Sequence, residues 1–239
     1  MDGCRPGPLL DLLWPRPCEI CARPAGEHAR YLCWDCLAAL PLIEAPHCAR
    51  CGDPVEGAVT GDYLCSLCVD RRPAFDLARS AVRFRGGVRE LLHRFKYGDA
   101  THLDRDLAML LKSCVAACYG SERLDAVAFV PLHAVRERSR TYNQARLLAK
   151  RLAQELAVPF APGCLARVRE TGSQTLLSMR QRTLNVEGAF QATAPEWIEG
   201  RRFLLVDDVM TTGATVAECS RVLKEAGAAR VLVVTVARG

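Results

Sequence analysis

Residues 203–218 read FLLVDDVMTTGATVAE, an apolar run that ends in two neighbouring carboxylates, Asp207 and Asp208. A continuous apolar run of this kind predicts a strand buried on both faces, as in parallel sheets. In open parallel sheets ligands bind beyond the carboxyl ends of the strands. The sequence therefore places both acids where a ligand would be held.

The flanking sequence alternates helical and strand patterns. Helical periodicity covers 86–98, continues from Leu103, and returns over 143–156, while 126–131 and the final RVLVVTVA run are short apolar strand candidates. Such alternation predicts an α/β fold, with a parallel sheet covered by helices on both faces.

A short loop follows the two acids and leads into a helix. Backbone N–H groups at a helix start attract anions, and threonine hydroxyls add further donors. Carboxylates accept hydrogen bonds from vicinal hydroxyls, so the acids and the loop together predict a sugar-phosphate site. The loop residues are Thr211, Thr212, Gly213, Ala214 and Thr215.

Eight of the 13 cysteines form four CxxC pairs near the start of the chain. Two CxxC turns complete the tetrahedral thiolate set that suits Zn2+, so four pairs predict two structural zinc sites with no open position. Sequential pairing is expected, and cross-braced pairing or a redox role are the alternatives. The expected ligand sets are Cys18, Cys21, Cys33 and Cys36, and Cys48, Cys51, Cys65 and Cys68.

The bulk composition is that of a globular protein. At 239 residues, the chain is long enough for one main domain plus a small module. No apolar stretch reaches the about 20 residues of a membrane span, and the first residues lack a signal-peptide pattern, so we expect no membrane insertion and a cytoplasmic location. The net charge of +5 is too small to indicate nucleic-acid binding by itself.

The stretch FLLVDDVMTTGAT resembles the phosphoribosyl pyrophosphate (PRPP) motif of type I phosphoribosyltransferases. With 84–98, 130–145, 172–190 and the cysteine-rich start, the chain is identified as a member of the ComF family of competence-associated, GntX-like proteins. The resemblance implies a short N-terminal helix and double zinc ribbon over 1–72. A Rossmann-like phosphoribosyltransferase domain would follow over 73–239.

The resemblance also implies site residues and ligands. Asp207 and Asp208 would orient the ribose of PRPP with Mg2+, and 211–215 would hold its 5′-phosphate. Arg136 and Arg140 would clamp the leaving pyrophosphate, because guanidinium groups bind phosphate oxygens in pairs. Residues 172–190 would form a hood over the substrate, with Gln174 and Arg182 among its contacts.

Three positions depart from common patterns. Thr141 and Tyr142 replace the usual Gly and Phe of the family, and Thr211 stands where purine-salvage relatives carry an acid. An ordinary purine-salvage role is therefore not expected, and the acceptor is unassigned. The residues after Lys96 are less basic than usual, which weakens the case for a phosphate grip there.

Two other functions fit the same sequence. The ribbons of a non-catalytic competence factor would bind single-stranded DNA or a competence-machinery protein, with Trp34 as a stacking residue. Alternatively, Trp34 packs the ribbon core, which is the expected placement. A sensor that binds PRPP without turnover would use the same sheet site.

Overall fold

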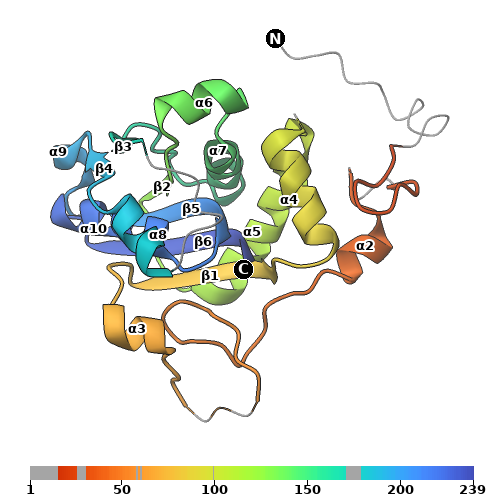
Figure 1. Ribbon diagram of the computed structural model, residues 1–239, viewed down its shortest axis with the longest axis horizontal. Helices are drawn as coiled ribbons and strands as arrows, with labels where there is room; N and C mark the ends of the chain where they lie inside the picture. Colours follow the sequence, from red (N-terminus) through yellow and green to blue (C-terminus); the bar gives the residue numbers. More distant parts are fainter. Residues whose placement is uncertain (1–15, 26–30, 58, 60, 99, 171–178) are drawn as a thin grey trace.

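The structure is a computed structural model that describes residues 16–25, 31–57, 59, 61–98, 100–170 and 179–239 (Figure 1). Its central sheet has four parallel strands in the order β1-β6-β5-β2. These strands are β1 (Leu77–Arg83), β2 (Ala126–Phe129), β5 (Arg202–Met210) and β6 (Arg230–Arg238). The expected parallel α/β sheet is confirmed.

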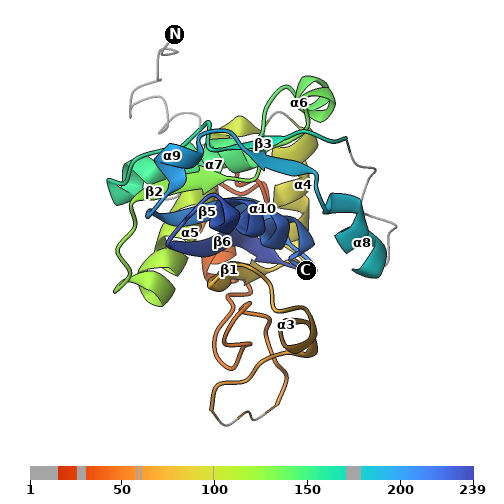
Figure 2. The same cartoon turned by 90° about the vertical axis from the view of Figure 1, so that its left-hand side faces the viewer.

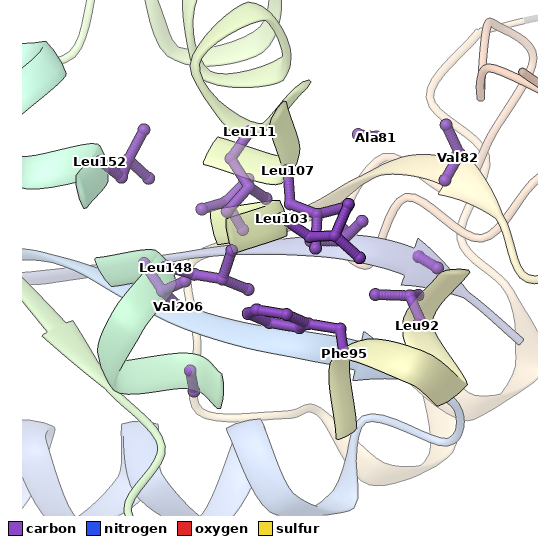
Figure 3. Close-up of a cluster of buried hydrophobic side chains, with 14 of the residues drawn as sticks. Ala81, Val82, Leu92, Phe95, Leu103, Leu107, Leu111, Leu148, Leu152 and Val206 are labelled. Atoms are coloured by element: carbon purple, nitrogen blue, oxygen red, sulfur yellow. The ribbon is translucent and has the colours of Figure 1, made fainter. Parts of the chain in front are cut away.

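Alternate residues of β5 face two separate cores. Leu204 and Val206 pack against the side covered by α4 (Gly87–Tyr97), α5 (Asp104–Tyr119) and α7 (Gln144–Leu156). Figure 3 shows Val206 among leucines from these helices. Phe203 and Leu205 face the opposite core, under α10 (Ala214–Glu225). Helices therefore cover both faces, as the continuous apolar strands require.

Shorter elements connect this framework. The 3-10 turn η1 (Thr101–Leu103) joins α4 to α5, and α6 (Ala134–Arg140) follows β2. The antiparallel pair β3 (Leu165–Arg167) and β4 (Phe190–Ala192) brackets α8 (Met179–Val186), and α9 (Pro195–Ile198) leads to β5. The segment 130–145, whose arginines Arg136 and Arg140 are expected to clamp the pyrophosphate, therefore contains the short helix α6.

The cysteine-rich segment flanks the sheet in two places. Its short helices are α2 (Trp34–Ala38) and α3 (Ser66–Arg71). The ribbon that carries α3 lies beside the edge strand β1 (Figures 1 and 2), where Ala78 N donates to Arg50 O at 2.8 Å. The ribbon that carries α2 contacts α4 and α5, because Tyr31 N donates to Asp106 Oδ2 at 3.0 Å.

Within the described ranges, none of the helices has the length and apolar character needed to cross a membrane.

Candidate functional site

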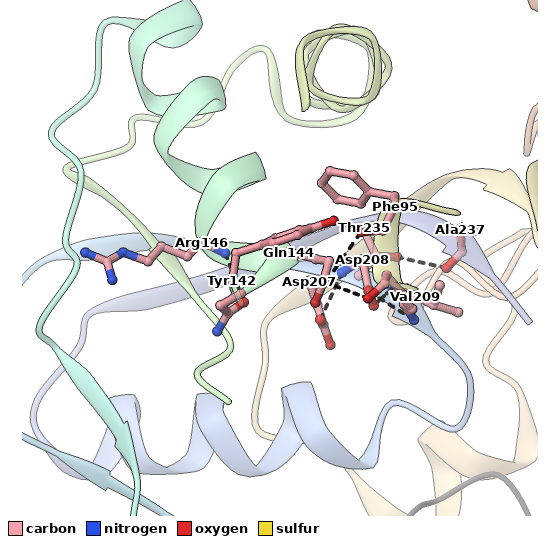
Figure 4. A network of polar contacts seen from close by, with 11 residues as sticks. Phe95, Tyr142, Gln144, Arg146, Asp207, Asp208, Val209, Thr235 and Ala237 are labelled. Atoms are coloured by element: carbon pink, nitrogen blue, oxygen red, sulfur yellow. Dashed lines mark hydrogen bonds and ion pairs between the residues drawn. The ribbon is translucent and has the colours of Figure 1, made fainter. Parts of the chain in front are cut away.

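The two acids lie side by side near the end of β5 (Figure 4). β5 continues past them to Met210, so they are strand residues, and Asp207 pairs in register with Thr235 of β6. Backbone N–H groups fix both carboxylates: Asp208 N donates to Asp207 Oδ1 at 2.9 Å, and Val209 N donates to Asp208 Oδ1 at 2.6 Å.

The charge of this pair is unusual. Burial, followed by the neighbouring charge of Asp208, raises the pKa of Asp207 from 3.8 to about 7. Asp208 forms an ion pair with Lys96, whose Nζ lies 3.0 Å from Asp208 Oδ2. The site therefore holds two carboxyl groups in unequal electrostatic environments.

Sequence reasoning missed Lys96, since it discounted the end of α4 as a phosphate-binding element. The available signal was the triplet FKY at 95–97, in which the helical period assigns Phe95 to the buried face and Lys96 is the next residue. Phe95 is fully buried, and the next residue, Lys96, leaves the helix on an adjoining face and reaches Asp208.

The threonine-rich loop lies where the sequence predicts, between β5 and α10. Thr212 Oγ1 accepts a 3.4 Å hydrogen bond from Ala214 N, and Thr215 is in the first turn of α10. Gly213 has φ +74°, and a Cβ there would lie 2.9 Å from Met210 Cε. Only glycine fits this turn without strain. The loop thus presents the N-terminus of a 12-residue helix next to the acids.

The basic groups expected at the site are only partly described. Arg136 lies on α6 near Arg167 of β3, and burial followed by the charge of Arg136 lowers the pKa of Arg167. The charge of Arg167 in turn opposes, to a small extent, the rise in the pKa of Asp207. Gln174 and the side chains of Arg140 and Arg182 lie outside the described residues.

Arg167 was also missed by sequence reasoning. It precedes the expected hood, in a segment with no helical or strand periodicity strong enough to assign. In the structure its guanidinium lies over the Phe190 ring, 5.2 Å from the centroid, so the β3–β4 pair fixes the position of this side chain.

The segment expected to form the hood, 172–190, is bonded near its end to α10, the helix that follows the threonine-rich loop. Gly188 N donates to Glu218 Oε1 at 2.7 Å, and Arg221 holds the same carboxylate. The Arg221 hydrogen bond is the main reason that the pKa of Glu218 is lowered. The C-terminal end of the hood is therefore tied to α10.

A cavity of about 700 Å³ lies between α3, the hood end and α10. Its walls include Phe75, Met210 and the loop residues Thr212, Gly213 and Ala214. Neither Asp207 nor Asp208 lines it. The cavity therefore adjoins the loop but is distinct from the surface formed by the acids.

The eight paired cysteines form two clusters, and in each the four Sγ atoms lie within 4.8 Å of one another. The clusters are Cys18, Cys21, Cys33 and Cys36, and Cys48, Cys51, Cys65 and Cys68. Sequential pairing is confirmed, and cross-braced pairing is wrong. Sγ separations of 3.5 Å (Cys21 to Cys33) and 3.6 Å (Cys51 to Cys65) suit tetrahedral Zn–S bonds of about 2.3 Å.

Arg238 supports the second zinc site from the end of β6. Its Nε donates to Asp53 Oδ1 at 2.8 Å, and its Nη2 lies 3.9 Å from Cys51 Sγ. A guanidinium beside four thiolates offsets the negative charge that such a zinc site carries. The sheet therefore supplies part of the environment of this zinc.

Comparison with known proteins agrees with both parts of the chain. Residues 9–70 match the double zinc ribbon domain, and residues 143–239 match the phosphoribosyl transferase domain.

The relatives that match across most of the chain include competence protein F of Haemophilus influenzae, 32% identical over 81% of this chain and 85% of the relative. DNA utilization protein YhgH of Salmonella typhimurium is 32% identical over 92% of this chain and 95% of the relative. Among solved structures, glutamine PRPP amidotransferase from B. subtilis has a TM-score of 0.41 at 22% identity, covering 59% of this chain and 30% of that one. The sequence matches show that the chain belongs to the ComF family, with a double zinc ribbon and a phosphoribosyltransferase domain.

Proposed function

We propose that the chain is a PRPP-binding, Mg2+-dependent phosphoribosyltransferase-like protein with an unassigned acceptor. The single observation that carries this proposal is the contiguity of Asp207, Asp208 and the 211–215 loop at one sheet end. Two carboxyl groups that can accept hydrogen bonds from ribose hydroxyls, beside a helix N-terminus that can bind a phosphate, match a ribose 5-phosphate. The names of the relatives add a link to competence and DNA utilization.

Each group then has a chemical role. Asp207 and Asp208 accept hydrogen bonds from the ribose hydroxyls, and the backbone N–H groups and hydroxyls of 211–215 hold the 5′-phosphate. Arg136 and Arg140 stabilise the negative charge that grows on the departing pyrophosphate. Mg2+ would be held beside Asp207 and Asp208 with few protein ligands, and it would supply positive charge that offsets the charge of the pyrophosphate.

The hood completes the proposed site. Gln174 and Arg182 would contact the substrate when 172–190 covers it, and exclusion of water would protect a reactive intermediate from hydrolysis. The Glu218 anchor fixes one end of this segment, so only the remainder needs to move.

The test is pyrophosphate release from PRPP and Mg2+ with a panel of bases, amines and single-stranded DNA, alongside direct PRPP binding. Release that is lost in Asp208→Asn supports a transferase. PRPP binding that Asp208→Asn abolishes, without release under any condition, identifies a sensor. Absence of both binding and release contradicts the proposal.

The surface of the first ribbon favours a second candidate function. Trp34 is 73% exposed, so the expected packing of Trp34 in the ribbon core is wrong. An exposed indole beside a zinc site suits stacking on single-stranded DNA, or contact with a partner protein.

Fluorescence anisotropy with labelled single-stranded DNA tests this function at several salt concentrations. Trp34→Ala should weaken binding, whereas Trp197→Ala, which removes a partly exposed indole from α9, should not. Equal affinities for Trp34→Ala and the unchanged chain would exclude stacking by Trp34.

A further inference from the structure

Lys96 occupies a position at the proposed sugar site that the proposed function does not explain. Its ammonium lies 3.0 Å from Asp208 Oδ2, with side chains only 22% and 12% exposed. The other oxygen of Asp208 already accepts a hydrogen bond from Val209 N. Lys96 therefore covers the one oxygen of this carboxylate that is not bonded to the β5 backbone.

The end of α4 is held by the segment that follows α6 (Figure 4). Tyr142 Oη donates to Phe95 O at 2.6 Å, and Gln144 Nε2 lies 3.3 Å from Lys96 O. Both residues belong to 130–145, which is the segment proposed to face the pyrophosphate. Lys96 is thus presented between the ribose side and the pyrophosphate side of the site.

The first zinc ribbon braces the same helix from the outside. Glu19 accepts a 2.7 Å hydrogen bond from Arg94 Nη1 and lies 2.8 Å from His102 Nε2. Gly87 packs so closely on the ribbon that a Cβ there would lie 2.6 Å from Ile20 Cγ2. The position of α4, and with it the reach of Lys96, depends on contacts at both ends of the helix.

A lysine ammonium on a flexible stem suits exchange between two anionic partners. When a ribose hydroxyl donates to Asp208, the ammonium loses that partner, and the nearest new anion would be the diphosphate of the ligand. The 5′-phosphate is not the expected partner, because its loop follows β5 and starts α10.

We propose that Lys96 binds the diphosphate group of the ligand, moving from Asp208 to it on binding, and that Tyr142 and the first zinc ribbon position Lys96 for this exchange. The inference rests on the proposed PRPP site, and it assigns the diphosphate to a residue outside the arginine-containing segment.

Calorimetric titration with Mg2+ and either PRPP or ribose 5-phosphate tests the role of Lys96. Ribose 5-phosphate lacks the diphosphate, so Lys96→Met should weaken PRPP binding by at least about tenfold, the effect expected for a hydrogen bond to a charged group. Ribose 5-phosphate binding should change by less than about threefold, and Lys96→Arg should restore part of the PRPP affinity.

Lys112→Met is the matched control. This substitution removes a lysine side chain from an ion pair of the same 3.0 Å length, which Lys112 of α5 forms with Glu155 of α7 on the exposed side of the two helices. The variant should bind both ligands with the affinity of the unchanged chain. Equal losses for both ligands in Lys96→Met, or no loss, would overturn the inference. Failure of the unchanged chain to bind PRPP would instead refute the proposed function.

Separate variants test whether Tyr142 and the first zinc ribbon position Lys96. Tyr142→Phe and Glu19→Gln should each weaken PRPP binding by about threefold to fivefold, consistent with the loss of one hydrogen bond, without changing ribose 5-phosphate binding. Asp35→Asn is the control for the ribbon, since it breaks only the exposed Arg23 ion pair. Zinc content is measured for both ribbon variants. An effect of Glu19→Gln no larger than that of Asp35→Asn would remove the ribbon from the proposal.

Discussion

The hydroxyl of Tyr142 donates a 2.6 Å hydrogen bond to the backbone carbonyl of Phe95, at the last turn of α4. The two aromatic rings also contact each other at a tilt of 57°, with centroids 6.2 Å apart. The phenylalanine common in the family could make the ring contact but has no hydroxyl to donate. The departure at Tyr142 therefore has a physical consequence, because its hydroxyl adds a shorter hydrogen bond to a carbonyl that also accepts from Gln144 Nε2 at 3.4 Å.

The neighbouring departure, Thr141, carries a conformational cost. Thr141 has φ +68°, where a β-branched residue is strained by about 1–3 kcal/mol and glycine is not. We expect Thr141→Gly to stabilise the fold by about 1 kcal/mol after the larger chain entropy of glycine in the unfolded state is subtracted. Urea denaturation measures this change.

Thr101→Gly serves as the comparison, because Thr101 is exposed and does not have positive φ. There the substitution should only destabilise. A Thr141→Gly variant that loses as much stability as Thr101→Gly would show that the positive φ stores no strain.

The raised pKa of Asp207 predicts a pH dependence of stability. With an ordinary pKa of 3.8 and a folded-state pKa of about 7, the folded chain binds the additional proton between these values. The stabilisation by this proton is complete below about pH 4 and is lost as pH rises to about 7. Asp207→Asn cannot ionise and should not show that loss.

At pH 8 the free energy of unfolding of the Asp207→Asn variant should therefore be higher than that of the unchanged chain by at least about 1 kcal/mol, or roughly 2–4 °C in Tm. This difference follows because one pKa unit corresponds to about 1.4 kcal/mol. At pH 4 the two should be nearly equal. Calorimetric scans of the ligand-free protein across this range measure the difference, and a constant difference at all pH values would contradict the raised pKa.

The parts of the fold that sequence could predict depend on local patterns. The zinc ligands follow from CxxC turns, and β5 from an uninterrupted apolar run. β1 was not predicted, because Arg79 and Ser80 interrupt its apolar pattern. The structure shows why they are there: Arg79 Nη2 donates to Ala49 O of the second ribbon at 2.9 Å, and Ser80 Oγ bonds Thr235 Oγ1 at 2.6 Å.

The parts that escaped prediction depend on contacts between distant segments. Lys96 and Asp208 meet because the end of α4 lies against the end of β5, a contact between distant segments that neither local pattern encodes. Arg167 reaches the site through a short β3–β4 pairing. Trp34 was expected in the ribbon core on the grounds of composition, but a ribbon this small gains its stability from metal and has little interior to bury an indole.

The hood anchor gives a third prediction. Glu218→Gln should release Gly188 only partly, because an amide oxygen still accepts its N–H, but it removes the ion pair with Arg221. Glu218→Ala removes both contacts and should increase the rate of proteolysis within the hood several-fold relative to Glu218→Gln. Limited proteolysis followed by mass spectrometry locates the cuts, and identical rates for both variants would show that the Gly188 contact does not hold the hood.

The two zinc sites should differ in their effect on the whole fold. The second ribbon is bonded to β1 through Arg50 O and to β6 through Arg238, so its loss exposes the edge of the sheet. Cys68→Ser should reduce zinc from two ions to one per chain and lower the Tm of the entire domain. Cys36→Ser removes one zinc equally but should lower Tm less, because the hydrogen bonds of Glu19 and Tyr31 join the first ribbon to α4, η1 and α5 rather than to a strand of the sheet. Cys118→Ser changes an exposed cysteine outside both clusters and should keep both ions.

Metal analysis by mass spectrometry measures the zinc content of each variant, and calorimetry measures its Tm. Equal Tm losses for Cys36→Ser and Cys68→Ser would show that the sheet contacts of the second ribbon add no stability.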